Sequence, residues 1–95
     1  MEMIKRSHDS IWDALEDSAE LAENMKLRSG LMMALDQHIT RAGWSQQDAA
    51  AMLGVSQPRI SDLVRGKIHL FSLDMLVNMA AAAGMHIEMR IHEPA

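Results

Sequence analysis

Side chains able to contact nucleic acid gather in the second half of the chain. Gln57, Arg59 and Asp62 fall on the outward side of one short helical stretch, and Arg65 and Lys67 follow it. Short polar side chains on a helix can hydrogen-bond to base edges, while flanking cations bind phosphates. The residue types and their spacing therefore predict a helix that reads DNA.

Two short helices joined by a tight turn are predicted to position these side chains. Ser45 can cap the first helix, and Gly54 follows its last apolar residue, where a left-handed backbone ends a helix. Ser56 can cap the second helix, and Pro58 falls in its first turn, where a missing N–H costs nothing. The apolar side chains expected to face the core are Ala49, Ala50, Met52 and Leu53 in the first helix, and Ile60, Leu63 and Val64 in the second.

So short a pair of helices needs other helices to pack on, because it cannot bury enough surface alone. Residues 25–42 supply one, and Ser18 could begin a longer helix with the same end. Ser72 can cap another helix over residues 73–83, which a glycine ends. The inward side chains are expected to be Leu31, Met32, Leu35, Ile39 and Ala42 in the first of these helices, and Leu73, Leu76, Val77 and Ala80 in the last.

Ten methionines are many for 95 residues. Methionine is flexible and fills irregular gaps, so most of them are interpreted as core side chains. Those expected at or near inward positions are Met25, Met32, Met33, Met52, Met75, Met79 and Met85. Trp44 directly precedes the Ser45 cap, where it resembles a staple residue that packs on the first helical turn and serves stability.

The net charge of the whole chain is −4, but the charge is unevenly distributed. Residues 1–26 carry −4, residues 27–70 carry +2 and residues 71–95 carry −2. The basic excess coincides with the predicted DNA reader, and local charge governs contact within a Debye length of ~8–10 Å. One copy with a local charge of +2 would bind DNA weakly, so phosphate contacts must come from two copies or from a partner.

Composition and residue spacing limit the other classes of function. The length suits one domain with a modest core, and 48% apolar residues exclude a wholly disordered chain. The absence of cysteine excludes disulfides, a thiol nucleophile and cysteine-ligated zinc. The sequence has no run of 18 apolar residues and no signal-type start, which predicts a cytoplasmic protein with no membrane partner.

Neither catalysis nor a metal site is expected. His86, Glu88 and His92 share one face of an extended stretch, but its outer members are ~20 Å apart at ~3.3 Å per residue. One chain cannot close a metal site with them. No Ser/His/Asp or carboxylate pair has a supporting local motif, so we expect no enzyme activity and no cofactor.

Residues 86–92 alternate between apolar and polar side chains, which is typical of a β-strand. Ile87, Met89 and Ile91 share the apolar face. A lone strand leaves its hydrogen-bonding edges unpaired, so it needs a partner. The simplest partner is the same strand of a second copy, antiparallel across a two-fold axis; a strand of another protein or residues 1–5 is the alternative. In such a homodimer two recognition helices ~34–36 Å apart would read an inverted repeat.

The central helix pair is similar to a known family. It resembles the helix-turn-helix of the Xre/Cro-repressor superfamily over residues 46–67, QQDAAAMLGVSQPRISDLVRGK. The residues in the expected places are Gln46, Ala49, Ala50, Leu53, Gly54, Val55, Ser56, Ile60, Ser61, Arg65, Gly66 and Lys67. Two flanking stretches, NMKLRSGLMMAL at 24–35 and KIHLFSLDMLVNMAAAAGMHIEMRI at 67–91, resemble small HigA-type antitoxins encoded beside RelE-like ribonuclease toxins. The resemblance covers roughly residues 11 to 92.

The resemblance implies a mainly α, lambda-repressor-like helix-turn-helix domain of four to five helices, with one C-terminal β-strand paired across a dimer. The charge and residue patterns divide the chain into an acidic N-terminal segment (1–24), the DNA-binding domain (25–84) and a dimerisation strand with a tail (85–95). The resemblance also implies an antitoxin that neutralises a RelE/HigB-like toxin and represses its own operon. A stand-alone repressor without a toxin, or an interaction module that has lost DNA binding, remains an alternative.

Contacts with double-stranded DNA can be assigned to individual residues. An amide pairs naturally with adenine, so Gln57 should contact a base edge. The positions of Arg59 and Asp62 face the groove in the family, whereas Pro58 replaces a frequent polar residue and removes one reader. The predicted base contacts are Gln57, Arg59, Ser61 and Asp62, and the predicted phosphate contacts are Gln46, Arg65 and Lys67.

The acidic N-terminal segment has two interpretations. Its apolar side chains recur at helical spacing and acidic ones fill the other face, which fits a solvated helix pinned to the core by Trp12. It also fits a cover for a basic RNA-cleaving toxin, because an acidic helix with an aromatic anchor complements positive charge. The residues predicted to bind the toxin are Ile11, Trp12, Leu15 and Glu16.

Overall fold

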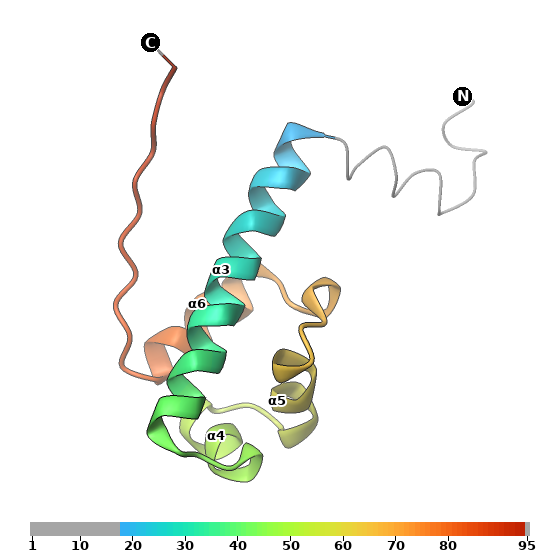
Figure 1. Cartoon of the computed structure of the whole chain (residues 1–95), viewed down its shortest axis with the longest axis vertical. Helices are drawn as coiled ribbons and strands as arrows, with labels where there is room; N and C mark the ends of the chain where they lie inside the picture. The colour runs from blue at the N-terminus through green and yellow to red at the C-terminus, as the bar shows by residue number, and fades with distance from the viewer. Residues whose placement is uncertain (1–17, 95) are drawn as a thin grey trace, which may run out of the picture.

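The computed structural model describes residues 18–94 and is mainly helical, as predicted. Its helices are α3 (Ala19–Ala42), α4 (Gln46–Leu53), α5 (Gln57–Val64), the 3₁₀ helix η1 (Ile68–Leu70) and α6 (Leu73–Ala82). The long α3 spans the molecule, α6 packs along it, and α4 and α5 lie together near its C-terminal half (Figure 1). The residues predicted to bind a toxin, from Ile11 to Glu16, lie outside the described residues.

Serine caps begin all four α-helices of the described range. Each cap hydroxyl accepts a hydrogen bond from the backbone N–H three residues later, at 3.0–3.2 Å. The caps are Ser18, Ser45, Ser56 and Ser72. The structure confirms three predicted helix starts and places the fourth at Ser18, so the longer of the two helices considered for this region is the one that forms.

The core lies between α3, α4, α5 and α6. The largest fully buried side chains are Leu35 on α3, Ile60 on α5, Phe71 after η1 and Leu76 on α6. Ala49 and Ala50 on α4 are also buried, and such small side chains allow neighbouring helices to approach closely. Phe71 was not among the predicted core residues.

Several apolar side chains predicted to be inward are exposed. Met33, Met52, Val64 and Val77 expose 38–60% of their surface, and Ala42 is exposed too. At 3.6 residues per turn, these four larger side chains lie roughly 70–130° from the centre of the buried face of their helix. An apolar residue at the edge of a short helix reaches the core only if another element covers that edge, and the described residues provide no such cover.

Trp44 lies directly before the Ser45 cap and packs against the core while remaining half-buried. Its ring contacts the edge of His38 on α3, with 5.3 Å between the ring centroids. The two aromatic rings thus connect the end of α3 to the start of α4. This arrangement agrees with the structural role predicted for Trp44.

Residues 85–94 leave α6 as an extended segment (Figure 1). The single chain forms no β-strand within the described range, so the predicted C-terminal strand is not confirmed. A strand is defined by backbone pairing, and the 18–94 range offers this segment no second strand. Met89 and Ile91 expose 74% and 82% of their surface, and Ile87 exposes 44%. The pairing with a second copy stays a prediction.

Candidate nucleic-acid interface

The α4–turn–α5 unit forms the helix-turn-helix, and its turn is determined locally. Gly54 has φ +70°, a left-handed conformation that a glycine adopts without a Cβ penalty. The backbone N–H groups of Gly54 and Val55 both donate to the carbonyl of Ala50 and so close the end of α4. Ser56 then starts α5 by accepting a hydrogen bond from the Arg59 backbone N–H. The turn therefore sets the orientation of α5 relative to α4, and this orientation determines which side chains of α5 face solvent.

Gln57 occupies the first position of α5 and is exposed, followed by the equally exposed Pro58. The first backbone N–H groups of a helix lack helical partners, so this end also carries a partial positive charge. An exposed amide beside such an end can reach a base edge while the helix start approaches the DNA backbone. Among the predicted base contacts, Gln57 is therefore the one that the structure leaves most available.

Arg59 is half-buried and lies against its own chain. Its Nη1 donates to the carbonyl of Leu70 at 3.0 Å, and its guanidinium carbon lies 5.4 Å from the centre of the Phe71 ring. A guanidinium has five N–H donors, so one bond to Leu70 leaves others for DNA. The position of Arg59 is nevertheless set by the loop after α5, which the sequence did not indicate.

Asp62 and Lys67 lie close to each other at the far end of α5. Asp62 Oδ1 is 4.0 Å from Lys67 Nζ, and the Lys67 backbone N–H donates to the Asp62 carbonyl at 3.1 Å. Their side chains are 27% and 42% exposed, so solvent screens the ion pair strongly. The carboxylate nevertheless offsets part of the positive charge that Lys67 would present to a phosphate.

Two of the other predicted contacts, Gln46 and Arg65, are solvent-exposed. Gln46 is the first residue of α4, beside the Ser45 cap, and Arg65 is the C-cap of α5. Gln46 shares its helix start with unpaired backbone N–H groups, a combination that suits a phosphate. Ser61 is half-buried on α5, where only part of its surface is accessible. The predicted contact residues thus all lie on or next to the helix-turn-helix unit, but some of their side chains are exposed and others are half-buried.

Arg28 has a structural role that sequence reasoning missed. Its Nη1 donates to the carbonyls of Ile68 and Phe71 at 3.2 and 3.3 Å, which ties α3 to the loop that follows α5. Arg28 was counted in the basic excess of residues 27–70, yet it binds backbone carbonyls of its own chain. Arg28 and Arg59 therefore hold the two sides of the 68–71 loop, and the interface has fewer free cations than the charge count suggested.

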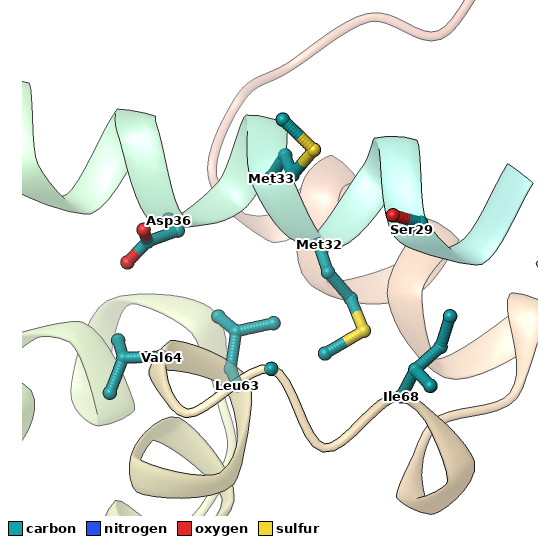
Figure 2. A pocket seen from close by; sticks show the side chains of 8 residues that line it. Ser29, Met32, Met33, Asp36, Leu63, Val64 and Ile68 are labelled. Atoms are coloured by element: carbon teal, nitrogen blue, oxygen red, sulfur yellow. The ribbon is translucent and has the colours of Figure 1, made fainter. Parts of the chain in front are cut away.

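A shallow groove of about 150 Å³ separates α3 from the end of α5 (Figure 2). Met32 on α3 points toward Leu63 and Ile68 across it, while Asp36 and Ser29 are its polar side chains. Small-molecule sites usually occupy ~300–1,000 Å³, so the groove is too small to favour a ligand of that class. Within the described residues no cluster of three metal-ligating side chains exists, and no described helix could cross a membrane.

Comparison with known proteins finds a matching family model and similar solved structures. The family model, described as "Helix-turn-helix domain", matches residues 14–92, which include α3 to α6 and most of the extended segment. A solved structure whose name assigns it to the XRE family of transcriptional regulators is 36% identical, with a TM-score of 0.71. That match covers 77% of this chain and 82% of the other chain. No curated protein matches the chain.

Proposed function

Because this chain belongs to the Xre-type helix-turn-helix family, we propose that it is a transcriptional regulator that binds an inverted-repeat operator as a homodimer. The observation that carries the proposal is the exposed start of α5, where Gln57 stands at the positive end of a helix that a glycine turn positions. A dimer is required because one interface carries few free cations, and affinity for DNA grows with the number of phosphates neutralised.

Each residue of the interface has a distinct proposed role. Gln57 reads a base, with adenine the natural partner of its amide. Arg59 contributes a second base contact through the donors that Leu70 does not occupy, and Ser61 and Asp62 contact bases at the edge of the site. Gln46, Arg65 and Lys67 bind phosphates on either side.

Fluorescence anisotropy with the DNA upstream of the gene tests the proposal. Gln57→Ala should cost ~1–3 kcal/mol on the operator and little on random DNA. Gln37→Ala removes the same amide from the exposed side of α3 and should change neither affinity. Arg65→Ala should weaken binding to both DNAs and reduce the slope of log K against log salt by about one. Equal losses on both DNAs for Gln57→Ala would reassign that residue to the DNA backbone, and parent protein that binds no upstream DNA would overturn the proposal.

We further propose that the regulator is an antitoxin for a basic RNA-cleaving toxin of the RelE/HigB type. The charge of −4 in residues 1–26 and the resemblance to HigA-type antitoxins support this second role. Residues 1–18 of the acidic segment precede α3 and are remote in sequence from the helix-turn-helix, so toxin and DNA can occupy different parts of the chain.

Deletion of residues 1–17 separates the two roles, because it retains the Ser18 cap of α3. The shortened protein should bind operator DNA normally and fail to protect cells that express the neighbouring toxin gene. Full protection by the shortened protein would refute the proposed toxin contact. Absence of a small basic open reading frame beside the gene would favour a stand-alone repressor, and absence of operator binding with retained toxin binding would favour an interaction module.

A further inference from the structure

The extended segment after α6 is symmetric about Met89. The residues on either side of Met89 read HIE and RIH. Ile87 and Ile91 lie two positions before and after Met89, and His86 and His92 lie three positions before and after it. The nearest neighbours, Glu88 and Arg90, carry opposite charges. A segment with this symmetry can pair with a reversed copy of itself without placing like charges opposite each other.

The structure leaves this segment available for such pairing. Its backbone is extended, and its apolar side chains Met89 and Ile91 are mostly exposed. The one ion pair within residues 18–94 joins Asp62 to Lys67, so neither Glu88 nor Arg90 has a charged partner in this range. The segment leaves the end of α6 and runs as a separate extended trace on one side of α3 (Figure 1).

We infer that two copies of the chain pair antiparallel over residues 86–92, with the two-fold axis at Met89. This inference rests on the homodimer proposed above and specifies its register. Glu88 of each copy then lies opposite Arg90 of the other, and the two Met89 side chains meet at the axis. Ile87 and Ile91 lie opposite each other on the apolar face. Directly opposite side chains in an antiparallel pair have Cβ atoms about 4.5–5.5 Å apart, close enough for ion pairs.

Competing registers are less favourable on charge grounds. A shift of two residues in one direction places Glu88 opposite Glu88, and a shift in the other direction places Arg90 opposite Arg90. A slip of one residue moves the apolar side chains to the opposite face. Parallel, in-register pairing places every charge opposite its own copy. Among these arrangements, the Met89-centred antiparallel one alone pairs both charges with opposite partners.

The apolar face of the paired ribbon also needs a cover, since a two-stranded ribbon is marginally stable in water. The outer side of α6 can provide it, because Val77 exposes 41% of its surface and Ala81 is exposed one turn later. With the α6 of one copy packed on the ribbon, the two-fold axis places the α6 of the other copy equivalently. In this arrangement the exposed apolar side chains of α6 and those of the segment bury each other.

Charge reversal on the full-length chain tests the register. Glu88→Arg places Arg opposite Arg, and Arg90→Glu places Glu opposite Glu, so each variant alone should dimerise about 10- to 100-fold more weakly than the parent. Mixed in equal amounts, the two variants should form heterodimers with near-parental affinity, because every charged pair is again opposite in sign. The double variant should regain homodimerisation. Glu93→Arg makes the same charge change outside the paired residues and should leave dimerisation unchanged.

Sedimentation equilibrium, with native mass spectrometry of variants that differ in tag mass, gives the readout. Statistical mixing or no heterodimer from the two single variants would overturn the inferred register, as would parental dimerisation of both. Both sites are exposed, so at concentrations where the parent is monomeric the unfolding midpoints of the variants should match that of the parent and exclude a folding defect. If only the register is wrong, the parent still dimerises and still binds the operator. If only the proposed DNA binding is wrong, the parent fails to bind the operator, but the two charge variants still form heterodimers. A monomeric parent would overturn both the register and the proposed homodimer.

Discussion

Arg59→Ala should reduce both the stability of the fold and the affinity for the operator, by amounts that can be measured separately. In the folded protein the guanidinium donates to the Leu70 carbonyl at 3.0 Å and lies over Phe71 at 5.4 Å. A hydrogen bond from a charged group contributes ~1.5–3 kcal/mol when well buried, but solvent reduces this contribution for a half-exposed side chain. A cation–π contact at an exposed site adds ~0.5–1 kcal/mol. We expect the free energy of unfolding to fall by roughly 1–2 kcal/mol.

Urea unfolding followed by circular dichroism measures the stability term, and anisotropy on operator and random DNA measures the binding term. The matched control is Arg65→Ala, which removes the same charge from an exposed side chain at the end of α5. That control should change the free energy of unfolding by less than about 0.5 kcal/mol. Arg59→Ala with parental stability would refute the view that the 68–71 loop holds this side chain. An equal affinity loss on both DNAs would refute its role in reading bases.

Three further substitutions test the fold. Leu76→Ala empties a fully buried position on α6 and should cost ~2–5 kcal/mol in urea unfolding, against less than about 1 kcal/mol for Met33→Ala, which shortens an exposed side chain on α3; equal costs would contradict the described core. In Gly54→Ala the added Cβ would meet no atoms, but the alanine would have to adopt φ +70°, so the free energy of unfolding should fall by ~1–2 kcal/mol. Gly30→Ala within α3 should raise it by up to ~1 kcal/mol. The same sign for both glycines would disprove the backbone explanation. Arg28→Met should cost ~1–3 kcal/mol by removing two carbonyl contacts, and a cost no larger than that of exposed Arg41→Met would show that these contacts are not stabilising.

Helix boundaries could be predicted because they depend on short-range chemistry. Ser45, Ser56 and Ser72 cap helices through hydrogen bonds to a residue three positions away, and Gly54 ends α4 through its own backbone conformation. Such interactions are complete within a few residues, so reading the local sequence is enough. The helix-turn-helix and its exposed Gln57 followed from these local signals.

The inward residues were predicted less well, because burial depends on which elements cover a helix edge. Val64 and Val77 continue apolar patterns, yet both are exposed in the described structure. Phe71 is fully buried although it belongs to no helix, and no periodicity marked it. The 68–71 loop is held against α3 by Arg28 and against α5 by Arg59, and these are contacts between parts of the chain that are separated in sequence.

By itself, the sequence determined the helices, the turn at Gly54 and the identity of the base-reading candidates. Tertiary structure decided which cations remain free for DNA. A charge count treats Arg28 and Arg59 like any other basic residue. In the folded chain Arg28 donates to the Ile68 carbonyl, 40 positions further along, and Arg59 donates to the Leu70 carbonyl, 11 positions further along. Those acceptors become neighbours only when α3, α5 and the 68–71 loop pack together. The physical reason is that a guanidinium binds whichever carbonyls the folded chain brings within hydrogen-bond distance, and local sequence does not specify them.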